Sequence, residues 1–281
     1  MTNIPNIKPT DIATRLNYFN KTGRNAFFWG PPGVGKSQII RQWAEAHAAD
    51  NGWQFVEVGV DPVPSDPANA YAFSDIRLSL ADPLDLKGAP LVDKEANITR
   101  FLKPSMLPDE RRHAKQGLLF LDELADATGL TVASISQLIL DRKIGDNYVL
   151  PEGWQIVAAS NEKSDGASAK RIPSQLANRF GHCRVMPDVE AYAAYLTRKG
   201  TDGRLKAFLR LRPELIHCRE NKDSTAYPTP RSWCAVSEVM DNVDDDRDFR
   251  QSLNAGFVGE GPAAELEGFL RIHYERAEES R

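Results

Sequence analysis

Hydrophobic positions along the chain change their spacing near residue 188. Before that point, short apolar runs alternate with segments whose apolar residues recur at helical spacing. The runs predict strands at residues 25–29, 53–58, 117–121, 154–160 and 182–185. Because strands that alternate with helices form parallel sheets covered on both faces, we expect an α/β fold here.

Beyond residue 188 the strand-like runs stop and helical spacing takes over. The helices expected there cover residues 189–199, 205–211, 231–240, 248–255 and 263–276. The pattern therefore predicts two domains, an α/β domain over residues 1–188 and a small all-α domain over residues 189–281.

Composition excludes several classes of protein. Of the 281 residues 41% are hydrophobic, which suffices to bury a sizeable core. The formal net charge of −4 gives no general reason to bind nucleic acid or an anionic membrane. No apolar run approaches the roughly 18 residues of a membrane span, and the first residues lack the pattern of a signal peptide. We therefore expect a cytoplasmic protein.

The first predicted strand is followed by a glycine-rich loop with the spacing of a phosphate-binding loop. The residues of this candidate site are Gly30, Pro31, Pro32, Gly33, Val34, Gly35, Lys36, Ser37 and Gln38. The loop lies between a strand and a helix, which is the context that the motif needs. Its glycines let backbone N–H groups face phosphates, and the helix dipole adds attraction. We predict that Lys36 reaches the β- and γ-phosphates of a nucleotide and that Ser37 binds Mg²⁺.

An acidic motif, Asp122 followed by Glu123, comes directly after the apolar run at residues 117–121. Ligand sites in open α/β sheets lie at the carboxyl ends of strands. Asp122 is placed to hold Mg²⁺, and Glu123 to polarise an attacking water. An acidic residue after a strand is ordinarily the N-cap of the next helix. Beside a phosphate loop, however, the paired carboxylates favour hydrolysis of the nucleotide.

Other polar residues are candidates for the same site. Asn161 ends the fourth predicted strand and could hydrogen-bond the attacking water or the γ-phosphate, although Asn there is more often a turn residue. Arg179 precedes the fifth strand and is a candidate cation for the nucleotide of a neighbouring subunit, with Arg171 as a weaker candidate. Arg231 opens a helix, where a cation is unfavourable unless it binds an anion.

Together these motifs resemble those of the AAA+ ATPases and, within them, the MoxR-like branch. The matching segments are Gly30–Ser37, Leu118–Glu123, Asn161, Asn178–Phe180 and Pro230–Arg231. The resemblance implies ATP and Mg²⁺, a five-stranded parallel sheet in the order 5-1-4-3-2, and a helical lid. It also implies that Asn161 is the sensor-1 residue, Arg179 the arginine finger and Arg231 the sensor-2 residue of a homo-oligomeric ring, expected to be a hexamer.

Two further segments resemble hairpins of the MoxR-like branch. Residues 91–101 are similar to the hairpin that interrupts the family's second helix, and residues 143–151 to the hairpin before sensor 1. The resemblance implies a chaperone-like remodeller of a protein partner or complex. Such ATPases often act beside a protein with a von Willebrand factor A domain.

Two other functions stay open. A nucleic-acid motor, or the nucleotide-driven component of a nuclease, predicts basic hairpins. The two hairpin regions carry both signs of charge, namely Lys94, Arg100, Lys103, Arg142 and Lys143 against Asp93, Glu95, Asp141 and Asp146. A scaffold that uses ATP only to hold its ring together predicts that Glu123→Gln leaves function intact.

Overall fold

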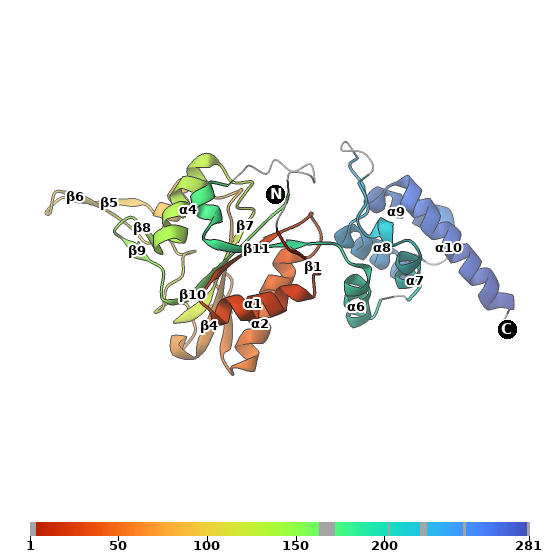
Figure 1. Ribbon diagram of the computed structural model, residues 1–281, viewed down its shortest axis with the longest axis horizontal. Coiled ribbons are helices and arrows are strands. Elements are labelled where there is room, and N and C mark those ends of the chain that lie inside the picture. The colour runs from red at the N-terminus through yellow and green to blue at the C-terminus, as the bar shows by residue number, and fades with distance from the viewer. Residues whose placement is uncertain (1–3, 163–171, 202, 220–223, 244–245, 280–281) are drawn as a thin grey trace. The chain divides into compact units, whose positions relative to one another are not determined.

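The computed structural model describes residues 4–162, 172–201, 203–219, 224–243 and 246–279. These residues form two compact units, each with a hydrophobic core of its own (Figure 1). The first unit comprises the described residues of Met1–Ile7, Asp11–Gly30 and Lys36–Val185. The second comprises those of Lys8–Thr10, Pro31–Gly35 and Met186–Arg281.

A sheet of seven strands, all paired in parallel, forms the centre of the first unit. In spatial order the strands are β1 (Asn6–Ile7), β11 (Phe180–Val185), β2 (Asn25–Trp29), β10 (Gly153–Ser160), β7 (Gln116–Asp122), β4 (Ala70–Arg77) and β3 (Gln54–Glu57). The central strands β2, β10 and β7 are buried at nearly every position. Their continuous apolar runs reflect a sheet that is covered on both faces.

The expected sheet of five strands in the order 5-1-4-3-2 is wrong in two respects. The two-residue strand β1 adds to one edge, and β4 inserts between β7 and β3. The five expected strands keep their succession across the sheet, but the third and the second are not neighbours. The pattern hid β4 because only its first half is a continuous apolar run. From Ser74 to Arg77, three of the four residues are polar and only Ile76 is apolar.

Helices cover both faces of this sheet. They are α1 (Asp11–Lys21), α2 (Lys36–Asp50), α3 (Pro83–Lys87), α4 (Gly129–Asp141) and α5 (Ser174–Ala177), with the short 3₁₀ turn η1 (Pro67–Asn69). Phe27 and Leu121 share one core with Ile135 of α4 and Leu176 of α5. Helices α1 and α2 lie on the other side of the sheet, where α2 buries Ile40 (Figure 1).

Two antiparallel hairpins extend this unit, β5 (Pro90–Asp93) with β6 (Ile98–Phe101) and β8 (Lys143–Ile144) with β9 (Tyr148–Val149). Both hairpins expected from the sequence are thereby confirmed. Every residue of β6 is exposed.

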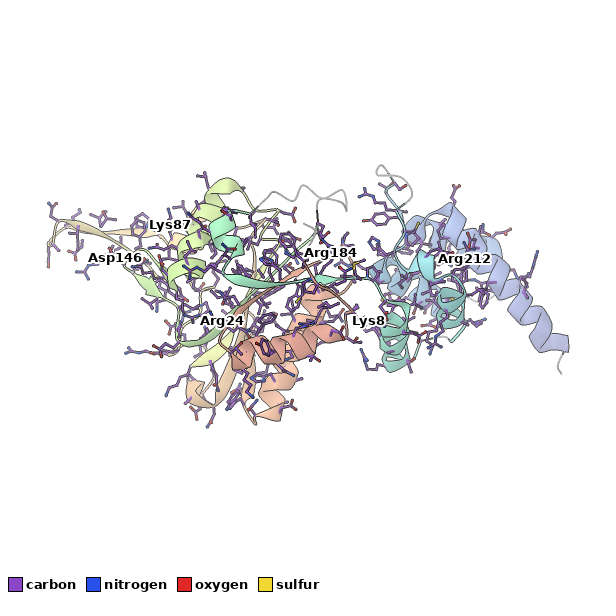
Figure 2. All side chains as sticks on the ribbon, in the orientation of Figure 1. Lys8, Arg24, Lys87, Asp146, Arg184 and Arg212 are labelled. Atoms are coloured by element: carbon purple, nitrogen blue, oxygen red, sulfur yellow. The ribbon has the colours of Figure 1, made fainter. Side chains whose placement is uncertain are left out.

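One side chain joins the two hairpins. Asn147, in the turn of the second hairpin, donates from Nδ2 to the carbonyl oxygens of Lys87, 3.4 Å away, and Phe101, 3.3 Å away. In Figure 2 the labelled residues Lys87 and Asp146 accordingly lie at the same end of the first unit. The turn of β8–β9 is therefore fixed to the base of β5–β6.

The second unit contains helices at the places that the periodicity predicts. They are α6 (Val189–Lys199), α7 (Gly203–Leu211), α8 (Pro230–Asn242), α9 (Arg247–Val258) and α10 (Glu260–Glu279). The 3₁₀ turn η3 (Pro213–Ile216), which the periodicity does not predict, follows α7. Its core packs around Trp233 and Leu266. The buried guanidinium of Arg250 forms a two-pronged ion pair with Glu267, at 2.7 and 2.8 Å. Among the described helices of the chain, none is both long and apolar enough to cross a membrane.

Replacing Gly117 with Ala tests the insertion of β4 beside β7. A Cβ at Gly117 would lie 2.3 Å from the Ala72 carbonyl oxygen of β4, so one strand must shift. We expect the free energy of unfolding to fall by about 1–3 kcal/mol, as for other overpacked cores. Urea unfolding followed by circular dichroism measures the change.

Gly129→Ala is the matched control, because nothing lies within 4 Å of the Cβ it adds at the start of α4. It should leave stability unchanged or raise it by up to about 1 kcal/mol. Equal stability of the two variants would contradict the pairing of β4 with β7.

Candidate nucleotide site

Several of the polar residues singled out by the sequence gather where neighbouring strands of the sheet end. The glycine-rich loop follows β2, the acidic motif ends β7, and β10 lies between these two strands. In register, Ala159 pairs with Asp122 and Ser160 with Trp29. Because parallel strands end at the same edge, Asp122, Asn161 and the start of the loop lie close together.

The backbone of the loop requires glycine where it leaves β2. Gly30 has φ 154°, and a Cβ there would lie 2.5 Å from the Val185 carbonyl oxygen. Gly33 and Gly35 have φ 77° and 92°, in the region that favours glycine. Val34 of the same loop is buried, whereas Gln38 is exposed on the first turn of α2.

Lys36, the first residue of α2, is 7% exposed. Its Nζ donates to the carbonyl oxygen of Gly30 at 2.7 Å and to Oδ1 of Asn161 at 3.2 Å. A buried ammonium is costly unless oxygen acceptors surround it. The structure therefore joins the loop, α2 and the end of β10 through this one charge.

Ser37 and Asp122 lie together in the way that a shared metal ion needs. The Ser37 hydroxyl donates to Oδ2 of Asp122 at 2.8 Å. The other carboxylate oxygen of Asp122 accepts from the Glu123 backbone N–H at 3.0 Å. Two adjacent ligands of an octahedral Mg²⁺, each about 2.1 Å from the ion, lie about 3.0 Å apart. The two oxygens therefore fit neighbouring positions around Mg²⁺.

Glu123 is oriented by the last residue of β4 and by a residue that follows it. Its carboxylate accepts a hydrogen bond from the Ser79 hydroxyl, and Arg77 Nε lies 3.9 Å from its Oε1. The Glu123 backbone has φ 57°, which is uncommon for a residue other than glycine. The carboxylate is thereby held beside Asp122 and partly open to solvent.

Asp75 of β4 adds a third carboxyl to this edge. The side chain is open to solvent on one side, but the surrounding protein removes part of its hydration, and Asp122 adds a like charge. Together these two causes raise the pKa of Asp75 to about 6. The group therefore carries a negative charge at neutral pH at a cost in free energy.

Sequence reasoning missed Asp75, Arg77 and Ser79 because it missed β4. The signal that could have found them is the apolar run Ala70–Phe73, which is followed by a further apolar residue, Ile76, among polar ones. Arg77 pairs in register with Asp122, which places it one strand away from the acidic motif.

Arg179 lies before the amino end of β11, whereas the glycine-rich loop follows the carboxyl end of β2. It directly precedes β11, whose first residue, Phe180, pairs in register with Asn25, the first residue of β2. Its side chain is exposed, and among the described residues none forms a hydrogen bond or an ion pair with it. Arg171, the other candidate, falls outside the described residues.

Arg231 is an exposed residue of α8 in the second unit. The helix begins with a capping box, in which Ser232 N–H donates to Thr229 Oγ1 at 3.0 Å and Thr229 N–H to Ser232 Oγ at 2.8 Å. Residues Pro31–Gly35, including Pro32, belong to the same unit. Within it, a Cβ added to Gly33 would lie 3.2 Å from Cβ of Arg231.

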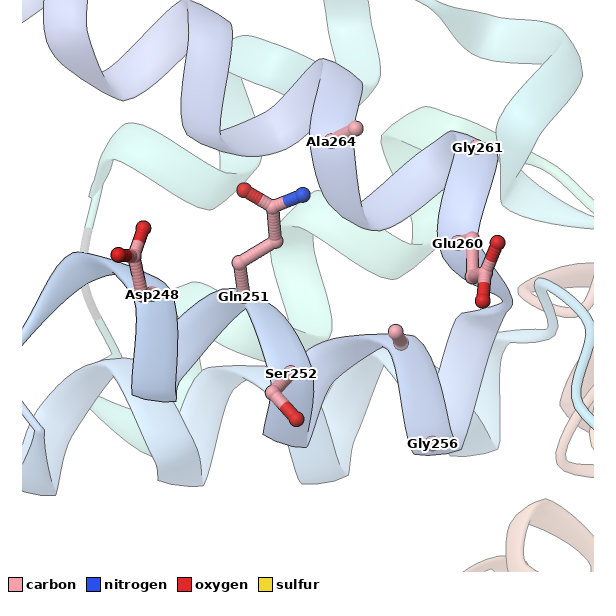
Figure 3. Close-up of a pocket in the computed structure, with 8 residues that line it drawn as sticks. Asp248, Gln251, Ser252, Gly256, Glu260, Gly261 and Ala264 are labelled. Carbon is pink, nitrogen blue, oxygen red and sulfur yellow. The ribbon is translucent and has the colours of Figure 1, made fainter.

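A groove of about 890 Å³ within the second unit does not suit phosphates. It runs between α9 and α10, with Asp248 and Glu260 at its two ends (Figure 3). The described residues that line it include these two carboxylates and no cation. It therefore repels anions and is not part of the candidate site.

No protein-family model matches the sequence, and no curated protein matches it. Solved structures do resemble the fold. A candidate ATPase from Cytophaga hutchinsonii has 12% identity and a TM-score of 0.44, covering 89% of this chain and 68% of that one. A point mutant of RuvB from Thermotoga maritima has 15% identity and a TM-score of 0.43, covering 95% and 71%. NtrX from Brucella abortus in complex with ADP has 15% identity and a TM-score of 0.42, covering 95% and 67%.

Asp75→Asn should raise the midpoint of thermal unfolding at pH 7.5. A raised pKa means that the folded protein favours the protonated carboxyl, so the charged form costs stability above pH 6. This cost shrinks as the pH falls toward 3.8, the ordinary value. Thermal unfolding without Mg²⁺ at pH 7.5 and 4.5 measures the difference.

Asp241→Asn, at an exposed position of α8, is the control and should change the midpoint little at either pH. A gain for Asp75→Asn that is the same at both pH values would contradict the desolvated, repelled carboxyl.

Proposed function

We propose that this chain is an AAA+ ATPase of the MoxR-like type, which binds ATP with Mg²⁺ and hydrolyses it to ADP and phosphate. One observation supports this most strongly. After β2, Lys36 donates a hydrogen bond of 3.2 Å to Asn161, which follows β10. The next residue, Ser37, donates one of 2.8 Å to Asp122 of β7. These residue types at one sheet edge form a site for phosphates and a divalent cation.

In the proposed complex, the loop N–H groups surround the phosphates. The Lys36 ammonium exchanges its bonds to Gly30 and Asn161 for bonds to the β- and γ-phosphates. Ser37 and Asp122 hold Mg²⁺, which neutralises negative charge on the phosphate oxygens when it is bound. Asn161 is then free to bind the γ-phosphate or the attacking water.

Glu123 is the proposed general base. A water oxygen attacks the γ-phosphorus, its proton passes to the Glu123 carboxylate, and the bond to the β–γ bridging oxygen breaks. Ser79 and Arg77 fix the direction in which this carboxylate points. A static nucleotide site would need Asp122 but not a second carboxylate aimed at water.

The sheet register supports a site that is completed by a neighbouring subunit. Arg179 directly precedes Phe180, which pairs with Asn25, whereas the glycine-rich loop begins after Trp29. Four residue steps along a strand span about 13 Å, so Arg179 is far from the loop of its own chain. An arginine that acts on the nucleotide must then come from another copy, which favours a ring, proposed to be a hexamer. Arg171 stays an alternative finger.

The helical part of the chain is proposed to act as the lid. Residues 189–281 would close over the nucleotide of domain 1–188 and bring Arg231 to the γ-phosphate as sensor 2. Loss of that phosphate then releases the arginine, so closure reports the state of the nucleotide.

The hairpins support a protein partner over nucleic acid. Leu91, Val92 and Ile98 are large apolar side chains exposed on β5–β6. Two of the cations of the hairpin regions form ion pairs within the chain: Arg100 lies 3.5 Å from Asp93, and Lys103 lies 2.6 Å from Asp109. We therefore favour a chaperone-like remodeller that acts on a protein or complex beside a partner with a von Willebrand factor A domain.

Glu123→Gln should abolish turnover and leave nucleotide binding intact. Gln keeps the shape and an acceptor for Ser79 but cannot take a proton, so we expect a loss of at least about 10²-fold in kcat. Phosphate release measures turnover, and a fluorescent ATP analogue measures binding. Glu110→Gln, at an exposed position, is the control. If Glu123→Gln leaves both function and assembly unchanged, the result would instead support a scaffold that uses ATP only to hold its ring together.

Arg179→Ala should lower turnover by about 10³-fold or more, the usual effect of removing an arginine finger. Mixing it with Lys36→Ala should restore activity, because each variant supplies what the other lacks. Turnover at constant total protein, with particle mass followed by light scattering, measures the rescue. Arg15→Ala, on the exposed side of α1, is the control. Wild-type activity of Arg179→Ala alone would count against a finger at this position.

A further inference from the structure

One imidazole joins the strand before the glycine-rich loop to the helix before Arg179. Trp29 Nε1 donates to His182 Nδ1 at 2.9 Å, and His182 Nε2 lies 2.8 Å from the Ala177 carbonyl oxygen. Trp29 is the last residue of β2 and directly precedes Gly30, while Ala177 is the last residue of α5. His182 itself lies on β11, between the two.

The chemistry of the two partners fixes the state of this histidine. An indole N–H can only donate, so Nδ1 must be the acceptor. A carbonyl oxygen can only accept, so Nε2 must carry the proton. His182 is therefore the neutral tautomer, and both of its ring nitrogens are hydrogen-bonded. Its ring stacks on that of Phe27, with 5.4 Å between the ring centroids.

The helix at the other end of the bridge is short and buries one side chain, Leu176, in the core. α5 has four residues, and its N-cap, Pro173, forms no side-chain hydrogen bond. A cavity of about 630 Å³ lies beside it, with Trp29, Ala177 and His182 in its wall. The bond from His182 therefore ties the last turn of α5 to the sheet, two residues before Arg179.

We propose that His182 is a positioning residue for Arg179. By holding Ala177 against β11, it fixes the direction in which the exposed Arg179 leaves the sheet toward the nucleotide of the next subunit. The same ring also bonds Trp29. One side chain therefore positions both the helix before Arg179 and the strand that carries the chain's own glycine-rich loop. This role rests on the proposed function, in which Arg179 acts in trans.

Two substitutions separate the two arms of the bridge. His182→Gln places an amide N–H near Nε2, so it keeps the donor to Ala177 but loses the acceptor for Trp29. His182→Asn places an amide oxygen near Nδ1, so it keeps the acceptor for Trp29 but loses the bond to Ala177. Both variants lose the stacked ring, and each is therefore the control for the other.

We expect His182→Gln to keep turnover within about twofold of the unchanged protein. His182→Asn should lose about fivefold or more in turnover, as for one hydrogen bond, with unchanged binding of a fluorescent ATP analogue. Equal losses in the two variants would show that the stacked ring matters and not the bridge, and would overturn the proposal, as would full activity of His182→Asn.

Mixed rings provide the second readout. Lys36→Ala subunits carry an intact Arg179, so they should restore turnover to His182→Asn subunits, whereas Arg179→Ala subunits should not. A mixture of Lys36→Ala with Arg179→Ala is the reference. If the reference is active but Lys36→Ala fails to rescue His182→Asn, the role of His182 is wrong while the trans site stands. If the reference itself is inactive, the trans site fails and the role of His182 fails with it.

Discussion

The buried ammonium of Lys36 is the constraint around which the candidate site is organised. An ammonium that is 7% exposed must be surrounded by oxygen acceptors, and two of these come from the loop itself and from the end of β10. That requirement brings β2, α2 and β10 into fixed relation. The strand order then places Asp122 of β7 against the next residue, Ser37. A phosphate group offers the same charge better acceptors than a carbonyl and an amide, so the resting arrangement is ready to exchange them.

Much of this arrangement could be predicted from local sequence. A strand, a glycine-rich loop and a helix are consecutive in the chain, and Asp122 ends a run whose burial is plain from its composition. The hairpins and the helices of the second unit likewise depend on contiguous patterns, and the structure places them as expected. The roles assigned to Glu123, Asn161, Arg179 and Arg231 stay predictions, because position alone does not establish chemistry.

The rest could not be predicted because it depends on which strands become neighbours. The polar second half of β4 hides the strand, and with it the pairing of Arg77 beside Asp122. Ser79 and Glu123 are 44 residues apart in the chain and meet only because β4 inserts next to β7. The link from Trp29 through His182 to Ala177 has the same origin, since it requires the pairing of β11 with β2.

The left-handed backbone of Glu123 has a consequence for how this position can evolve. A residue with a side chain costs of order 1–3 kcal/mol in a backbone with φ 57°, and glycine would largely avoid this cost. A glycine at this position would therefore relieve the backbone strain but would remove the carboxylate. Selection for stability and selection for chemistry then act in opposite directions on a single residue, and a glutamate that persists in descendants of this chain would record which of the two is stronger.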